Sequence, residues 1–88
     1  MDTVEFYRDN NSNGEILAVF PKENYYSDAN IGYGRVTKED VENTFVAYAN
    51  IGQHGAVHKD YLKENCVLID KEEAQDLYKE LKQIGYEI

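Results

Sequence analysis

The C-terminal third of the chain carries an apolar stripe that predicts an amphipathic helix, and such a helix needs an apolar surface to cover. Apolar side chains recur at spacings of three and four residues, which is one face of an α-helix. They are Ala74, Leu77, Tyr78, Leu81 and Ile84. Asp70 and Glu73 have the spacing of an N-cap and its N3 partner, and Gly85 is an expected left-handed stop. We expect this helix to pack on a sheet.

Three upstream segments have the patterns of strands that would form this sheet. Thr3–Arg8 alternates between apolar and polar residues, which is typical of a half-buried strand. Glu15–Phe20 ends at Pro21, and its apolar run is typical of a central strand that is covered on both sides. The Asn-rich turn at 9–14 predicts a hairpin between these two strands. Thr44–Ile51 predicts a third strand.

The remaining segments complete a predicted α+β fold. Thr37–Asp40 resembles a helix N-cap, and Ala56–Asn65 predicts a short helix after the turn Gly52–Gly55. Cys66–Ile69 is either a buried crossing or a brief strand, and Tyr86–Ile88 can return as a short final strand. We therefore expect a small antiparallel sheet of three to four strands with two helices on one face, in the order β-β-β-α-α.

The chain of 88 residues predicts a single domain with one Tyr- and Gly-rich insertion at about 22–36. A structureless loop of this length is uncommon in a compact domain and is often functional. Its tyrosines could instead lie over the core, or residues 31–36 could form a short edge strand. If the insertion is functional, its candidate binding residues are Tyr25, Tyr26 and Tyr33.

The composition restricts the partners. The net charge is −8, from 17 acidic and 9 basic residues. This balance argues against nucleic acid or an anionic membrane as a partner and favours a basic protein. The single cysteine, Cys66, excludes an intrachain disulfide and fits a reducing compartment. No long apolar run predicts a transmembrane helix, and no signal core follows Met1, so we expect a cytoplasmic protein.

One segment carries a family resemblance. Tyr48 and Ile51–His54 form a Tyr-x-x-Val/Ile-Gly-Gln-His segment, and the last helix ends in Leu-x-x-Ile-Gly-Tyr at residues 81–86. The chain thereby resembles a family of small uncharacterised proteins from bacteriophages and conjugative elements of gut bacteria. The resemblance covers most of the chain except residues 22–42, and Leu68–Lys71 replaces the family's Pro-containing start of the last helix. It implies a mobile-element origin and no particular chemistry.

His54 and His58 stand four residues apart and are the first candidates for a binding site. On one helical face they could share a zinc ion with Cys66 or Asp60 nearby. A structural zinc site uses four well-placed ligands, however, so we expect no metal and no cofactor. The turn that contains Gln53 and His54 could hold an anion on its backbone amides, although it lacks the Gly-Lys-Ser/Thr end of a phosphate-binding loop.

Catalysis has weaker support than binding. His54 could act as a general base, and Cys66 could act as a nucleophile beside a histidine. Cys66 precedes the apolar residues Val67–Ile69, so it is better interpreted as a small packing residue. We therefore expect that the protein is not an enzyme.

The last helix also carries an acidic strip. Glu72, Asp76 and Glu80 are four residues apart in succession, and like charges at this spacing destabilise a helix by roughly 0.2–0.5 kcal/mol per pair. The strip could bind a basic surface, or it could be an ordinary solvated face.

These observations favour a non-catalytic, acidic protein-interaction or regulatory protein of a mobile element or phage. It would bind a protein through the Tyr-rich segment, an exposed face around Tyr48 and the acidic strip. The sharpest form of this hypothesis is an inhibitor of a host protein that handles nucleic acid. One alternative is a small ligand- or metal-binding module at Gln53, His54 and His58. Another is a self-assembling accessory protein that forms homodimers through an edge strand.

Overall fold

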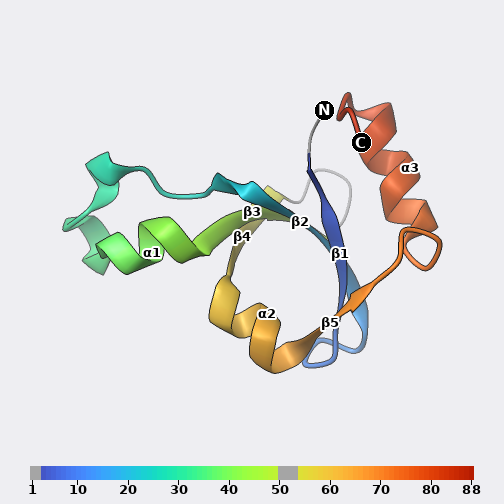
Figure 1. Cartoon of the computed structure of the whole chain (residues 1–88), viewed down its shortest axis with the longest axis horizontal. Helices are drawn as coiled ribbons and strands as arrows, with labels where there is room; N and C mark the ends of the chain where they lie inside the picture. Colours follow the sequence, from blue (N-terminus) through green and yellow to red (C-terminus); the bar gives the residue numbers. More distant parts are fainter. Residues whose placement is uncertain (1–2, 50–53) are drawn as a thin grey trace.

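The computed structural model describes residues 3–49 and 54–88, and these residues form one five-stranded antiparallel sheet in the order β4-β3-β2-β1-β5 (Figure 1). The strands are β1 (Glu5–Asp9), β2 (Glu15–Asn24), β3 (Thr44–Tyr48), β4 (His54–His58) and β5 (Cys66–Ile69). The helices are α1 (Lys38–Asn43), α2 (Lys59–Asn65) and α3 (Gln75–Gln83), with the 3₁₀ turns η1 (Asp28–Asn30) and η2 (Tyr33–Arg35). The predicted α+β class is confirmed, with one strand and one helix more than expected.

The hairpin of β1 and β2 is confirmed. The two strands pair in register from Glu5 opposite Val19 to Asp9 opposite Glu15. The turn between them needs left-handed backbone, which Gly14 adopts at a φ of 73°, and the Gly14 N–H donates to the Asp9 carbonyl at 2.9 Å.

The sheet is covered on both faces, so the prediction of two helices on one face is wrong. Successive residues of a strand point to opposite faces. On β2, Ala18 and Phe20 point to α3, whereas Val19 points to α2. The α3 side contains Phe6, Ala18, Phe20, Ala74, Leu77 and Leu81. The α2 side contains Val19, Ala47, Val57 and Leu62. The two-sided apolar run of β2 therefore lies between two small cores.

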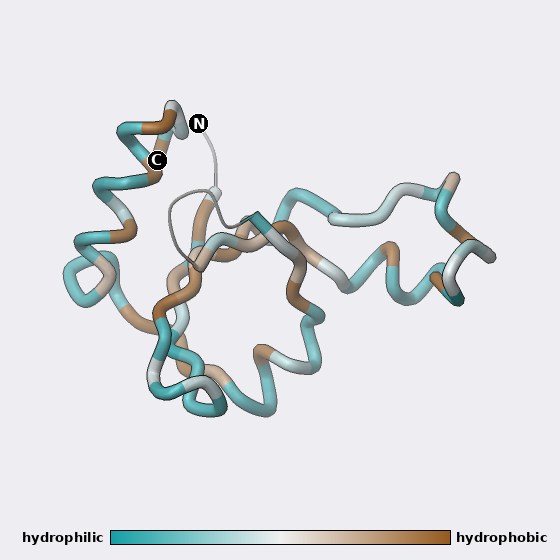
Figure 2. The backbone as a smooth tube through the Cα atoms, turned by 180° about the vertical axis from the view of Figure 1, so that it is seen from behind, coloured by the Kyte–Doolittle hydropathy of each residue, from teal (hydrophilic) through white to brown (hydrophobic). Residues whose placement is uncertain are grey.

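Helix α2 joins the two edges of the sheet. Figure 1 shows a curled sheet in which α2 passes from edge strand β4 to edge strand β5 and completes a ring, while α3 lies outside this ring. Viewed from behind, most hydrophobic positions follow the strands around this ring (Figure 2). This path explains why the two helices cover different faces, because α2 crosses the inner face and α3 is attached after the chain has left β5.

The predicted helix from Ala56 begins later than expected. His54–His58 is β4, which pairs with β3 from Thr44 opposite His58 to Tyr48 opposite His54. Only after this ladder does α2 begin, at Lys59. Gly55 and the β-branched Val57 are poor helix formers, and the open edge of β3 supplies hydrogen-bond partners for an extended segment.

Of the two interpretations of Cys66–Ile69, the strand is correct. This segment is β5, which pairs antiparallel with β1 from Phe6 opposite Ile69 to Asp9 opposite Cys66. It is an edge strand, and it leaves Val67 and Leu68 exposed.

Helix α3 starts later than predicted but packs as predicted. Residues 70–74 form turns in which Glu73 N–H donates to the Asp70 carbonyl, and the helix begins at Gln75. Three members of the predicted stripe, Ala74, Leu77 and Leu81, are buried. Ile84 is exposed, contrary to the prediction.

The end of α3 is a Schellman motif. Gly85 has a φ of 112°, its N–H donates to the Lys82 carbonyl, and the Tyr86 N–H donates to the Leu81 carbonyl at 3.1 Å. The predicted final strand at 86–88 does not form. Instead, the Tyr86 ring stacks on Phe20 with a centroid distance of 4.8 Å, and this contact holds the C-terminal residues against the core.

Residues 21–43, called the arm here, project from the sheet beside β3 (Figure 1). The arm begins where Pro21, which has no N–H, interrupts the ladder: Phe20 pairs with Val46, but the next pair is Asn24 with Phe45. Strand β2 therefore continues past Pro21, where it was expected to end. Residues 25–36 do not cover the core, because their 3₁₀ turns η1 and η2 bury no residue, and η2 takes the place of the edge strand considered for residues 31–36.

Helix α1 returns the arm to the sheet. Its predicted capping box is confirmed, since the Asp40 N–H donates to Thr37 Oγ1 at 3.1 Å and the Thr37 N–H donates to Asp40 Oδ2 at 2.9 Å. Over residues 3–49 and 54–88, none of the helices combines the length and apolar character that crossing a membrane requires.

Candidate functional site

The arm presents large apolar and aromatic side chains to solvent. Tyr33 is 74% exposed, Tyr25 is 45% exposed and Ile31 is 42% exposed. Tyr26 is half-buried and meets Tyr25 edge to face at a centroid distance of 5.1 Å. The three tyrosines that the sequence singled out therefore all lie on the arm, and two of them are exposed.

Local hydrogen bonds hold the arm in shape. The Ser27 N–H donates to Asn30 Oδ1 at 2.8 Å, and the Gly32 N–H donates to the Val36 carbonyl at 2.9 Å. Gly32, with a φ of 91°, takes a left-handed conformation that a bulkier residue would resist. Because turns rather than core contacts order this segment, its exposed side chains are available for an external contact.

Tyr48 does not present the exposed face that the sequence analysis expected. It is half-buried, and its ring meets Phe20 at 6.2 Å, Tyr86 at 5.6 Å and His54 at 5.0 Å between centroids. The Tyr86 hydroxyl also donates to the Tyr48 hydroxyl at 3.0 Å. The face of β3 that carries Tyr48 is thus covered by the C-terminal residues.

A concave pocket of about 580 Å³ lies on the inner face of the sheet. Its apolar lining includes Leu17, Ala47 and Val57, and its polar lining includes Asp9, His54, His58 and Tyr61. The two histidines lie at opposite ends of β4. Four residues of extended strand span about 13 Å, so the two histidines do not have the one-turn helical spacing on which a shared zinc ion would depend. Gln53 lies outside the described residues.

A buried carboxylate joins α2 to β1. Asp9 is buried, and its Oδ2 accepts a hydrogen bond of 2.7 Å from the Tyr61 hydroxyl, while its Oδ1 accepts one of 2.9 Å from the Asn11 N–H. A hydrogen bond between residues 9 and 61 leaves no local pattern in the sequence, so it was not predicted. The pair fixes α2 over the pocket.

We predict that Tyr61→Phe lowers the free energy of unfolding by about 1.5–3 kcal/mol, because it removes a hydrogen bond to a buried charged group and leaves the ring in place. Urea denaturation followed by circular dichroism measures this difference. Tyr33→Phe, which removes a hydroxyl from an exposed ring, is the matched control and should change stability by less than about 0.5 kcal/mol. Equal stabilities of the two variants would contradict the assigned role of Tyr61.

Cys66 packs as the sequence analysis expected. It is half-buried beside the core on the α2 side. Burial raises the pKa of its thiol above the usual value, and the negative charge of Asp9 raises it further. The thiol is therefore protonated at neutral pH, which makes it a weak nucleophile.

The three residues of the predicted acidic strip line one shallow depression of about 450 Å³, together with Glu15 and Glu73. Glu72 precedes α3, so the three do not form one continuous helical strip as predicted. They are brought together because the turns before α3 pack beside the start of β2. Glu73 is paired with Arg8, whereas Glu72 and Asp76 are exposed. The contribution of Glu15 was not predicted from the sequence.

Comparisons of the chain with protein-family models, with curated proteins and with solved structures find no significant match.

Proposed function

We propose that the chain is a non-catalytic interaction protein that docks a basic protein through its arm. The observation that carries this proposal is the exposure of Tyr25, Ile31 and Tyr33 on a segment that projects from the sheet (Figure 1). Interfaces are enriched in tyrosine, whose large ring is held by only two side-chain torsions and therefore loses little entropy on binding.

The charge of the chain supports a basic partner. A net charge of −8 attracts a basic surface and raises the rate of encounter, more strongly at low salt. The acidic depression lies beside α3, and α3 and the arm are at opposite ends of the molecule in Figure 1. The acidic depression therefore attracts the basic partner at long range and is not part of the contact that the arm makes.

The sharpest form of this proposal is an inhibitor of a host protein that handles nucleic acid, encoded by a phage or another mobile element. The resemblance stated above supports the origin, and the charge supports the target, because a surface that binds nucleic acid is basic. In this form the acidic chain competes with nucleic acid for the same surface.

Capture from cell lysate with a paired set of variants tests the proposal. The double substitution Tyr25→Ser/Tyr33→Ser removes the exposed rings of the arm. Leu68→Ser removes a side chain that is 60% exposed on β5, away from the arm, and is the matched control. We expect wild type and Leu68→Ser to retain the same basic protein, and the double variant to lose it. Capture of one set of proteins by all three would contradict the proposal.

The pocket on the inner face favours a second candidate, the binding of a small ligand. Its volume of about 580 Å³ lies within the range of ligand pockets, and its lining combines an apolar floor with polar residues that include His54, His58 and Tyr61. The chain has two histidines, so their ring signals in an NMR spectrum report on binding directly. A fragment screen in which no compound shifts either signal would contradict this candidate.

A further inference from the structure

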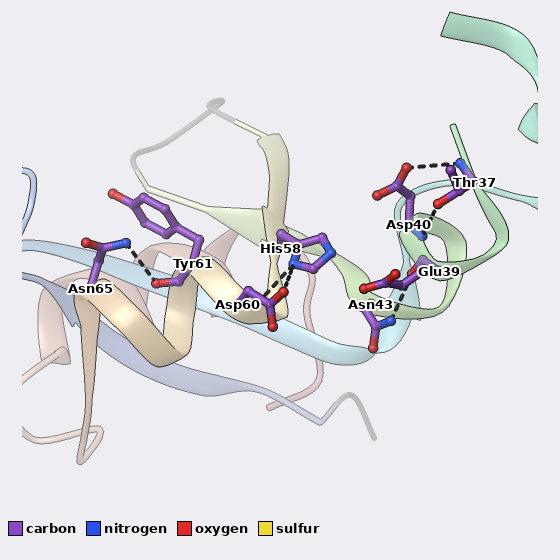
Figure 3. Close-up of polar contacts among 8 residues, drawn as sticks. All are labelled: Thr37, Glu39, Asp40, Asn43, His58, Asp60, Tyr61 and Asn65. Carbon is purple, nitrogen blue, oxygen red and sulfur yellow. Dashed lines mark hydrogen bonds and ion pairs between the residues drawn. The ribbon is translucent and has the colours of Figure 1, made fainter. Parts of the chain in front are cut away.

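Three side chains that can bind a divalent cation meet where the arm joins the sheet (Figure 3). They are Glu39 of α1, His58 at the end of β4 and Asp60 in the first turn of α2. One ligand atom of each lies within 4.8 Å of the others, and His58 Nδ1 is 3.8 Å from Asp60 Oδ2. Figure 3 shows the His58 ring between the two carboxylates.

The strand register brings these residues together. Helix α1 ends at Asn43, directly before β3, and α2 begins at Lys59, directly after β4. Because Thr44 pairs with His58, the end of α1 lies opposite the start of α2. The side chain of Asn43 also donates to the Glu39 carbonyl at 2.9 Å, which supports the last turn of α1. The arrangement is therefore built on the backbone ladder and not on side-chain positions alone.

We propose that Glu39, His58 and Asp60 form a binding site for a transition-metal dication such as Zn²⁺, with water completing the coordination. One imidazole nitrogen and two carboxylate oxygens suit zinc and related ions better than the all-oxygen ions Mg²⁺ and Ca²⁺. Bond lengths of about 2.0–2.2 Å in tetrahedral geometry place two ligands of one ion roughly 3.3–3.6 Å apart. The 3.8 Å between His58 Nδ1 and Asp60 Oδ2 is slightly longer than this, so a small rotation of the exposed Asp60 side chain brings it into range, and Glu39 approaches by rotating its own exposed side chain.

The present hydrogen bonds of His58 are compatible with this role. Its Nδ1 accepts a hydrogen bond of 3.0 Å from the Asp60 N–H, so this nitrogen carries no proton and directs its lone pair toward the start of α2 (Figure 3). A bound ion replaces this hydrogen bond, and the Asp60 N–H then donates a hydrogen bond to water, because Asp60 is exposed. The exchange leaves no buried polar group without a partner.

A cation at this site joins α1 to α2 and thereby ties the arm to the sheet. It would limit the movement of the arm relative to the ring of strands. The site does not depend on the function of the arm, since cation binding is measured on the isolated chain without any partner.

Zinc titration of the untagged, chelator-treated protein tests the site. Calorimetry gives the affinity, and NMR gives one ring signal for each of the two histidines. We expect Zn²⁺ to shift the His58 signal and to leave that of His54 in place, and Mg²⁺ at the same concentration to shift neither. A titration that moves only His54, or that moves neither histidine, would overturn the proposal.

Substitutions identify the ligands. Glu39→Gln, Asp60→Asn and His58→Asn should each weaken Zn²⁺ binding by at least about tenfold, the lower end of the effect seen even for outer-shell partners. Asparagine at 58 retains a capping side chain for α2, so this variant is expected to fold. Glu42→Gln removes one carboxylate from the exposed surface of the same helix α1 and should bind Zn²⁺ as wild type does. Wild-type affinity in Glu39→Gln and Asp60→Asn would refute the site.

Discussion

Phe20→Ala is expected to lower the free energy of unfolding by about 3–5 kcal/mol, the typical loss for removing a buried aromatic ring. Phe20 is 0% exposed. It stacks on Tyr86 and meets Tyr48 edge to face, and it belongs to the same cluster as Leu81 of α3. A chain of 88 residues has a total stability of roughly 4–13 kcal/mol, so this single change removes a large part of it.

Urea denaturation with circular dichroism measures the effect, and a lowered midpoint with an unchanged slope shows that stability has changed. Tyr33→Ala removes a ring of similar size from an exposed position of the arm and should change stability by less than about 0.5 kcal/mol. A loss of less than about 1 kcal/mol in Phe20→Ala would contradict the placement of the C-terminal residues over β2.

Leu62→Ala is expected to lower the free energy of unfolding by about 2–5 kcal/mol. Leu62 is 7% exposed and is the buried residue of α2, where it packs in the cluster of Val19, Ala47 and Val57. Lys63→Ala, at the next, exposed position of the same helix, is the matched control and keeps the helix propensity high.

The same residue tests whether the sheet is covered on both faces. Leu62 and Leu81 belong to different clusters on opposite sides of the sheet, so the effects of Leu62→Val and Leu81→Val should add to within about 0.5 kcal/mol. A larger coupling energy in this double-mutant cycle would indicate a shared core and would contradict the two-sided arrangement.

Local signals in the sequence predicted much of the fold. The stripe of α3 and its stop at Gly85 depend on spacing within one segment, as do the capping box of Thr37 and Asp40 and the turn of the first hairpin. Strand β4 was missed, because His54–His58 has one buried apolar residue and becomes a strand only through pairing with β3. The two-sided apolar run of β2 indicated that both faces of this strand are covered. No local pattern shows that α2 crosses the second face, because its path depends on tertiary contacts.

The candidate site was predictable to a smaller extent. The sequence singled out Tyr25 and Tyr33 because an aromatic insertion is unusual in a small domain, and both are exposed. It misplaced Tyr48, whose cover comes from Tyr86, thirty-eight residues later in the chain. The pair of Asp9 with Tyr61 and the approach of Glu39 to His58 depend on the strand register, for which the sequence carries no local pattern.

The central claim is that the exposed rings of the arm bind a basic protein, and the affinity of the purified partner tests it most directly. Calorimetry at low and high salt should show at least about a 30-fold loss for Tyr25→Ser/Tyr33→Ser, the equivalent of one hot spot of about 2 kcal/mol. Leu68→Ser should bind the partner as wild type does, and added salt should lower the affinity of the wild type and of Leu68→Ser alike. Wild-type affinity in the double arm variant would contradict the claim.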